Sequence, residues 1–157
     1  MPIKASAPSS VLLVCLGNIC RSPLAHGILQ SKLPDSFIVD SAGTGNYHIG
    51  SPPDSRSISV AKKHGIDIST QKCRQFKVSD FDRFDIIYVM DSSNYNNVVN
   101  LARDTKDVSK VKLILEEIKT VISSEVPDPY YGDISDFEYV FNVLNEACEQ
   151  IAINLKD

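Results

Sequence analysis

The sequence predicts an α/β fold, a three-layer sandwich with a four-stranded parallel sheet flanked by helices and a phosphate-binding loop after the first strand. Three observations predict it. Short aliphatic runs alternate along the chain with segments of helical spacing. The first run, residues 11–14, is continuous, which is typical of a strand covered on both faces. A Cys-Leu-Gly-Asn-Ile-Cys-Arg-Ser segment follows it, at the strand end where such sheets bind ligands.

Local signals define each further element in turn. Ser22 suits the N-cap of a helix and Pro23 its first position, so we expect a helix that continues to residue 33. Gly65 is a usual C-terminal signal for a second helix over residues 54–64. Residues 42–53 contain three glycines and two prolines and should form a long surface loop. The remaining expected strands are residues 37–39, 85–89 and 111–115, and the remaining expected helices are residues 92–101 and 137–155.

The length of 157 residues predicts a single domain over residues 11–157, behind a flexible N-terminal tail of residues 1–10. Hydrophobic residues make up 43% and charged residues 23%, as in ordinary globular proteins. The net charge of −4 argues against binding to nucleic acid or to an anionic membrane surface. The apolar run at residues 11–16 is too short to span a membrane.

The cysteines point to a reducing environment. The four of them, Cys15, Cys20, Cys73 and Cys148, form no C-x-x-C pair, and no histidine cluster completes a zinc site. So few cysteines in a chain of this length argue against a disulfide framework, and we expect a cytoplasmic location. Cys73 and Cys148 look isolated and semi-buried.

The segment from Cys15 to Ser22 has the residues that an anion site needs. Backbone N–H groups where a strand turns into a helix form a concave site for an anion. Gly17 and Asn18 tolerate the left-handed backbone that this turn needs. Arg21 is spaced to clamp two oxygens of the anion, and Ser22 to donate a hydrogen bond to Cys15.

The positive charge around this segment should keep Cys15 as a thiolate, ready to attack phosphorus. A lone cysteine is more often a buried core residue. Here a glycine, an asparagine and an arginine accompany it at a strand-to-helix turn, which favours a nucleophile. A cysteine protease with His48 or His64 is a weaker alternative, because no third catalytic residue matches either histidine.

Asp128 is the candidate general acid. Attack on a phosphate ester expels an alkoxide or phenoxide, which leaves more easily with a proton from an acid. The segment V-P-D-P-Y-Y-G at residues 126–132 places Asp128 between two prolines. An isolated Asp-Pro pair is usually part of a turn. Beside the cysteine loop, the catalytic interpretation is favoured.

C-L-G-N-I-C-R-S-P near the start and D-P-Y-Y-G late in the chain resemble the low-molecular-weight protein tyrosine phosphatases. D-S-A-G-T at 40–44, P-D-S-R at 53–56 and F-D-x-x-x-V-M-D-x-S-N at 84–94 agree, so the resemblance covers nearly the whole chain after residue 10. The order of the motifs also fits, because other cysteine phosphatases carry the acid before the loop. The resemblance implies an enzyme that hydrolyses phosphotyrosine and small aryl phosphates through a phosphocysteine intermediate.

The resemblance also implies residue roles. Cys15 is the nucleophile, Arg21 binds phosphate and stabilises the transition state, and Asp128 protonates the leaving group and then activates water. No metal or other cofactor is implied, because Arg21 and backbone amides supply the positive charge. Tyr47 and Tyr130 resemble the walls that hold the phosphotyrosine ring. The residues expected to bind substrate are Leu16, Gly17, Asn18, Ile19, Cys20, Ser22, Tyr47, His48 and Tyr130.

Some of the residues expected behind the cysteine loop differ from those that the family usually carries. Ser41 is expected to support the loop by bonding Asn18, and Asp91 to anchor the active-site side of the sheet. Relatives often carry a histidine where Thr70 stands here, so we expect Asn18 to be held differently.

The expected partners are phosphotyrosine-containing proteins, with inorganic phosphate or similar oxyanions as product or inhibitor. The expected state is a monomer or a weak dimer through the loop of Tyr130 and Tyr131, which are also candidates for phosphorylation. Cys20 lies close enough in sequence to Cys15 for a disulfide, which predicts reversible oxidation by peroxide.

Three other functions are weaker alternatives. Arsenate reduction, performed by some relatives, needs a relay of further cysteines, whereas Cys73 and Cys148 look isolated. Relatives that hydrolyse phosphoarginine tend to carry a small β-branched polar residue where Ile19 stands here. A phosphate-binding module without turnover would be expected to lack the nucleophile, the arginine or the acid, and all three are present.

Overall fold

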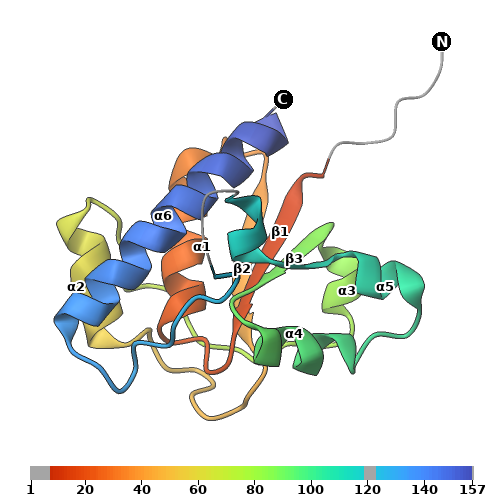
Figure 1. Ribbon diagram of the computed structural model, residues 1–157, viewed down its shortest axis with the longest axis horizontal. Coiled ribbons are helices and arrows are strands. Elements are labelled where there is room, and N and C mark those ends of the chain that lie inside the picture. Colours follow the sequence, from red (N-terminus) through yellow and green to blue (C-terminus); the bar gives the residue numbers. More distant parts are fainter. Residues whose placement is uncertain (1–7, 119–122, 157) are drawn as a thin grey trace.

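A four-stranded parallel sheet forms the middle of the molecule (Figure 1). The computed structural model describes residues 8–118 and 123–156. The strands follow the order β2-β1-β3-β4, so β1 is an inner strand. Their bounds are Ser10–Cys15 for β1, Ile38–Gly43 for β2, Ile86–Val89 for β3 and Val111–Leu113 for β4.

Helices cover both faces of the sheet, which confirms the predicted three-layer α/β fold (Figure 1). α1, α2 and α6 lie on one face and α3 and α4 on the other, with α5 packed beside β4. A 3₁₀ turn, η1, follows β4. The bounds are α1 Arg21–Lys32, α2 Ser55–Lys63, α3 Asp80–Arg83, α4 Ser92–Val99, α5 Thr105–Ser109, η1 Ile114–Glu117 and α6 Ile134–Lys156.

The packing of β1 explains the first aliphatic run. Val11 and Leu13 belong to the hydrophobic cluster beneath α1 and α6, whereas Leu12 and Val14 belong to the cluster beneath α3 and α4. All four side chains are fully buried, because alternate residues of a strand point to opposite faces and both faces are covered. Burial of each of these side chains stabilises the folded state by roughly 1.5–3 kcal/mol. Cys15 therefore stands at the end of a firmly packed strand.

The start of α1 differs from the prediction. α1 begins at Arg21 with Cys20 in the N-cap position, and not with Ser22 as N-cap and Pro23 as first residue. The Ser22 hydroxyl accepts a hydrogen bond from Asn18 Nδ2 at 2.8 Å. The preceding turn therefore uses this hydroxyl, so it does not cap the helix.

The observed bounds of β1 and β3 differ from the prediction by no more than one residue at either end, whereas β2 and β4 differ by more. β2 runs to Gly43 rather than ending at residue 39, because its second half pairs with Val14 and Cys15 of β1. Residues 42 and 43 consequently belong to the sheet and not to the surface loop. β4 ends at Leu113, where the chain tightens into η1, rather than extending to residue 115.

The predicted helices are present with small differences. Asp54 caps α2 by accepting a hydrogen bond from the Arg56 N–H, and Gly65 adopts a φ of 81° after the helix, as its signal predicts. α4 ends at Val99 rather than at residue 101, and α6 begins at Ile134 rather than at residue 137. α3 and α5 have no counterpart among the predictions, because they are too short to show an amphipathic repeat.

The expected flexible tail over residues 1–10 lies mostly outside the described residues. Its last member, Ser10, is the first residue of β1. Asp85 Oδ2 accepts hydrogen bonds from the backbone amides of Ser9 and Ser10, at 2.9 and 3.2 Å. Across residues 8–118 and 123–156, no helix combines the length and the apolar character needed to cross a membrane.

Candidate active site

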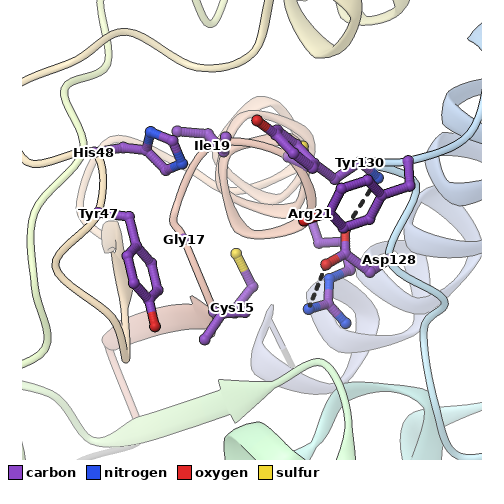
Figure 2. Close-up of a pocket in the computed structure, with 11 residues that line it drawn as sticks. Cys15, Gly17, Ile19, Arg21, Tyr47, His48, Asp128 and Tyr130 are labelled. Carbon is purple, nitrogen blue, oxygen red and sulfur yellow. Dashed lines mark hydrogen bonds and ion pairs between the residues drawn. The ribbon is translucent and has the colours of Figure 1, made fainter.

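The turn from β1 into α1 curves around the sulfur of Cys15 (Figure 2). The Asn18 N–H donates to Cys15 Sγ at 3.3 Å, and Ser22 Oγ lies 3.0 Å from the same sulfur. Asn18 has a φ of 57°, the left-handed conformation expected of it. This backbone reversal lets residues 16–20, which we call the cradle, approach the sulfur from one side.

Backbone amides of the cradle are available to an oxyanion. The N–H groups of Gly17, Ile19 and Cys20 donate to no protein acceptor within residues 8–118 and 123–156. The N-terminus of α1 follows directly, and its dipole favours negative charge in front of it. The cradle thus has the donors and the electrostatic field of an anion site.

Arg21 lines the same site from the first turn of α1, with a side chain only 3% exposed. Nη1 donates to Asp91 Oδ2 at 2.6 Å and to the Val126 carbonyl at 2.9 Å. Burial by itself lowers the pKa of Arg21, but its anionic neighbours raise the pKa overall. Cys15 has the largest effect among these neighbours, followed by Asp91. Asp91, expected to anchor this side of the sheet, therefore holds the arginine directly and also caps α4.

A cavity of about 430 Å³ opens onto Cys15 (Figure 2). Three segments build its walls: the turn after β1, the loop between β2 and α2, and the loop before α6. The fold thereby gathers residues that are far apart in the sequence. The lining residues are Cys15, Leu16, Gly17, Ile19, Cys20, Arg21, Tyr47, His48, Asp128, Tyr130 and Tyr131.

Two residues expected to bind substrate are not in this lining. Asn18 and Ser22 are 2% and 0% exposed, so they are buried away from the cavity. Tyr131, which the sequence suggested only for dimerisation or phosphorylation, does line the cavity, and it is 94% exposed. The aromatic side of the cavity therefore consists of Tyr47, His48 and the two tyrosines of the loop before α6, Tyr130 and Tyr131. The ring centres of His48 and Tyr130 are 6.5 Å apart.

Asp128 reaches toward Arg21 from the loop before α6 (Figure 2). Its Oδ2 lies 3.8 Å from Arg21 Nη2, and its Oδ1 accepts a hydrogen bond from the Tyr130 N–H at 3.1 Å. The side chain is 42% exposed, so solvent and a ligand both have access to it. The carboxyl group stands beside the arginine of the anion site.

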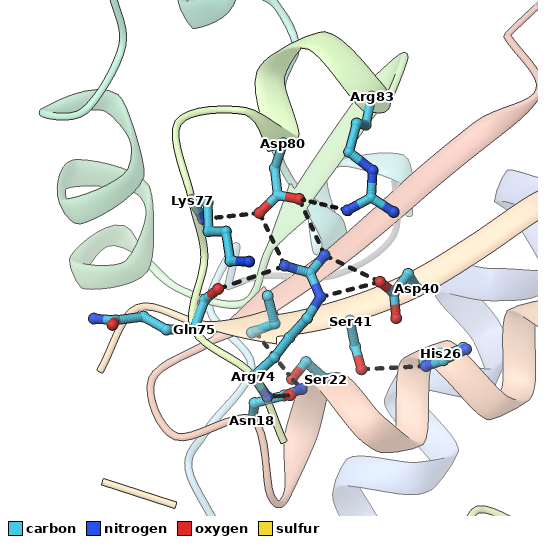
Figure 3. A network of polar contacts seen from close by, with 11 residues as sticks. Asn18, Ser22, His26, Asp40, Ser41, Arg74, Gln75, Lys77, Asp80 and Arg83 are labelled. Carbon is cyan, nitrogen blue, oxygen red and sulfur yellow. Dashed lines mark hydrogen bonds and ion pairs between the residues drawn. The ribbon is translucent and has the colours of Figure 1, made fainter. Parts of the chain in front are cut away.

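Arg74 holds Asn18 from behind (Figure 3). Asn18 Oδ1 accepts a hydrogen bond from the Arg74 backbone N–H at 3.0 Å. Thr70, which stands where relatives often carry a histidine, is exposed. The backbone amide of Arg74, rather than a side chain, thus supplies the donor to Asn18 Oδ1.

The Arg74 side chain is fixed by two carboxylates (Figure 3). Nε donates to Asp40 at 3.1 Å, and the two terminal nitrogens donate to the fully buried Asp80 at 3.0 and 3.1 Å. The Arg74 carbonyl also accepts from the Gly43 N–H at 2.9 Å. A Cβ added at Gly43 would lie 2.7 Å from the Leu16 carbonyl oxygen, so only glycine lets β2 approach the cradle this closely.

The expected bond between Ser41 and Asn18 is wrong. Ser41 Oγ instead lies 3.2 Å from Nδ1 of His26, a residue of α1 that had no predicted role (Figure 3). Burial lowers the pKa of His26, which keeps the ring neutral near neutral pH. Ser41 therefore links β2 to α1, and it makes no direct contact with Asn18 among the hydrogen bonds of the described residues.

All four cysteines are free and buried. The expectation that Cys73 and Cys148 are semi-buried is wrong, because they are 4% and 0% exposed. The Cys73 thiol donates to the Asn18 carbonyl at 2.8 Å, so it contacts the cradle. Burial raises the pKa of Cys73 to about 11, and burial likewise raises the pKa of Cys20 and of Cys148. In the part of the chain that the structure describes, no three or more His, Cys, Asp or Glu side chains come together to hold a metal ion.

Comparisons with known proteins agree with this arrangement. The sequence profile of the family described as "Low molecular weight phosphotyrosine protein phosphatase" matches residues 10–157. The human low molecular weight phosphotyrosine protein phosphatase is 41% identical over 150 residues, covering 90% of this chain and 92% of the human one. A protein tyrosine phosphatase structure from Entamoeba histolytica has a TM-score of 0.88 at 38% identity, covering 94% of this chain and 96% of that one. The tyrosine phosphatase Wzb from Escherichia coli K30, in complex with sulphate, has a TM-score of 0.84 at 30% identity, covering 94% and 99%.

The α/β sandwich with this cradle at the end of its first strand is the architecture of a phosphatase enzyme. The chain belongs to the low-molecular-weight protein tyrosine phosphatase family, which confirms the resemblance carried by the motifs at residues 15–23 and 128–132.

Proposed function

We propose that the protein hydrolyses phosphotyrosine and small aryl phosphates through a phosphocysteine intermediate. One observation carries the proposal: a single cavity brings together Cys15 Sγ, the Arg21 guanidinium and the Asp128 carboxyl group. Phosphoryl transfer through a cysteine requires these three kinds of group, as nucleophile, electrostatic clamp and general acid.

In the first step, the Cys15 thiolate attacks the phosphorus of the bound ester. The S–P bond forms as the bond from phosphorus to the phenolic oxygen breaks. Asp128, in its acid form, gives its proton to that oxygen, so a neutral phenol leaves. Arg21 and the free amides of the cradle bind the phosphoryl oxygens, whose charge they stabilise through the transition state.

In the second step, a water molecule attacks the phosphorus of the phosphocysteine. Asp128, now a carboxylate, takes a proton from that water, and the S–P bond breaks to return the thiolate and inorganic phosphate. Ser22 Oγ, 3.0 Å from Cys15 Sγ, is placed to donate to the departing thiolate. The acid form of Asp128 is thereby restored for the next cycle.

The aromatic rim suits a phenyl ring. Tyr47 and Tyr130 are 71% and 36% exposed and line the cavity, where they would pack against the ring of phosphotyrosine. His48 stands between them at the rim. Its proposed role is to contact the same ring or the peptide beside it.

We propose phosphotyrosine-containing proteins as substrates, and inorganic phosphate or similar oxyanions as product or inhibitor. The sulphate bound to the Escherichia coli relative supports the oxyanion part. The four free cysteines fit a reducing compartment, for which we propose the cytoplasm. In this proposal residues 11–157 act as one phosphatase domain, in a monomer or a weak dimer, and the family match over residues 10–157 supports the single domain.

Turnover of p-nitrophenyl phosphate and of a phosphotyrosine peptide, with a metal chelator present, tests the proposal. We expect the reduced protein to hydrolyse both substrates at mildly acidic to neutral pH, with or without the chelator, and inorganic phosphate to inhibit competitively. Failure of the reduced protein to hydrolyse either ester would contradict the proposal and favour a binding module. Thiol-dependent turnover of arsenate would favour the reductase alternative.

We also propose that Cys20 protects Cys15 from irreversible oxidation. Peroxide converts the Cys15 thiolate to a sulfenic acid, the Cys20 thiol displaces water to form a disulfide, and a dithiol then reduces it. Both cysteines line the same cavity. After a pulse of peroxide followed by a dithiol, Cys20→Ser should recover less activity than the wild type, whereas Cys148→Ser should recover as the wild type does. Equal recovery of Cys20→Ser and wild type would contradict the proposal.

A further inference from the structure

Arg56 holds the loop that carries Asp128. This arginine lies in the first turn of α2, outside the residues that line the cavity in the described part of the chain. Its Nη2 donates to the Tyr130 carbonyl at 2.9 Å, and its Nη1 donates to the Gly132 carbonyl at 3.0 Å. Both carbonyls follow Asp128 closely in the sequence. One guanidinium group therefore binds residues 128–132, which we call the acid loop, at two points.

Arg56 is fixed in turn by Asp54. Nε and Nη2 of Arg56 each lie 3.0 Å from an oxygen of the Asp54 carboxylate. The hydrogen bonds from Arg56 lower the pKa of Asp54 although partial burial opposes them, so the pair stays ionised near neutral pH. The guanidinium carbon also lies 4.4 Å from the centre of the Phe137 ring, in the first turn of α6. A planar group held by a bidentate carboxylate and a ring face has little freedom to move.

The same pair is joined to the cradle. The Asp54 N–H donates to the Ile19 carbonyl at 2.8 Å, and Ile19 belongs to the cradle. At the other end, the Tyr130 N–H donates to Asp128 Oδ1 at 3.1 Å. Hydrogen bonds therefore connect the cradle, the Asp54–Arg56 pair and the acid loop, three segments that are far apart in the sequence.

We propose that Arg56 is a positioning residue that sets where Asp128 stands relative to a phosphate ester in the cradle. The inference rests on the proposed role of Asp128 as general acid. Proton transfer needs the acid within hydrogen-bond reach of the leaving oxygen, and a displacement of about 1 Å costs on the order of 10²-fold in rate. Loss of the Arg56 side chain would release the acid loop without removing a group that lines the cavity.

A series of leaving groups separates this role from a purely structural one. Arg56→Ala should lower kcat/KM for phenyl phosphate by roughly 10- to 100-fold, because the poor leaving group needs a well-placed proton. The same variant should change kcat/KM for 2,4-dinitrophenyl phosphate little, because that phenolate leaves without one. Inhibition by inorganic phosphate should stay at the wild-type level, because Arg21 and the cradle amides remain.

Three further variants complete the test. Arg56→Lys keeps the charge but not the planar fork, so we expect a smaller loss with the same dependence on the leaving group. Arg103→Ala is the matched control, because Arg103 is likewise an arginine held by carboxylate groups, those of Asp82 and Asp107, but lies outside the cavity lining, so the variant should behave as the wild type. Asp128→Ala should lower kcat/KM for phenyl phosphate at least as much as Arg56→Ala does, and should change kcat/KM for 2,4-dinitrophenyl phosphate far less.

Equal losses for both esters, or phosphate inhibition that weakens in step with the rate, would overturn the inference and assign Arg56 to the fold or the cradle. Wild-type rates in both Arg56 variants would also overturn it. Absence of leaving-group dependence in Asp128→Ala would instead show that the acid assignment fails, and the proposed role of Arg56 would fail with it.

Discussion

Replacement of Cys15 by serine should abolish turnover, with a loss on the order of 10⁶-fold in kcat, as the loss of a covalent nucleophile costs in other hydrolases. A serine hydroxyl at this position is not ionised near neutral pH and has no base assigned to it, so no phosphoenzyme forms. The cradle amides and Arg21 do not depend on the sulfur, and inorganic phosphate should still bind. Hydrolysis of p-nitrophenyl phosphate and calorimetric titration with phosphate measure the two effects.

Cys148→Ser is the matched control for this substitution. Cys148 is fully buried in α6 and does not line the cavity, so the variant should keep its turnover once folded. Substantial turnover by Cys15→Ser would show that another group is the nucleophile. Loss of phosphate binding together with turnover would mean that the sulfur is needed to shape the cradle.

Replacement of Asp128 by alanine should slow the reaction according to the leaving group. General acid catalysis contributes roughly 10²- to 10⁴-fold, and we expect a loss in this range in kcat/KM for phenyl phosphate. Esters of acidic phenols should be affected far less, because their phenolates leave without a proton. A plot of log kcat/KM against the pKa of the leaving phenol should therefore be steeper for the variant than for the wild type.

Asp35→Ala is the control for Asp128→Ala, because Asp35 is an exposed aspartate outside the cavity lining. Its plot should coincide with that of the wild type. If Asp128→Ala hydrolyses phenyl phosphate at the wild-type rate, the general acid is another group.

The local part of the site could be predicted from the sequence. An anion cradle at a strand-to-helix turn is made of consecutive residues, so Cys15, Gly17, Asn18 and Arg21 reveal it by their types and spacing. The left-handed φ of Asn18 and the position of Arg21 in the cavity agree with that pattern. The place of Asp128 in the cavity could be predicted only because its motif accompanies the cysteine loop.

The supports behind the cradle could not be predicted, because they use backbone atoms or distant partners. Asn18 is held by the amide of Arg74, and any residue type other than proline supplies such an amide. Ser41 bonds His26 because β2 and α1 pack together, which their local sequences do not show. The hydrogen bonds from Arg56 to two backbone carbonyls could not be predicted either, because backbone carbonyls leave no mark on the sequence. This holds although Arg56 lies in the P-D-S-R segment that the resemblance includes.

Strands and helices could be predicted where the local sequence determines them, and could not where contacts with distant segments do. β1 was predictable because burial on both faces requires an unbroken aliphatic run. The second half of β2 contains Ser41 and Gly43, which suggest a loop, but pairing with β1 makes it a strand. α3 and α5 are single short turns of helix whose positions depend on tertiary packing rather than on periodicity.

Rapid-quench mass spectrometry during turnover of 2,4-dinitrophenyl phosphate tests the central claim most directly. With this fast-leaving phenolate, a phosphoryl group should appear transiently on the peptide that contains Cys15, and it should persist longer in Asp128→Ala, where no carboxylate activates the water. Turnover without any phosphorylated protein, or with the phosphoryl group on a residue other than Cys15, would contradict the account.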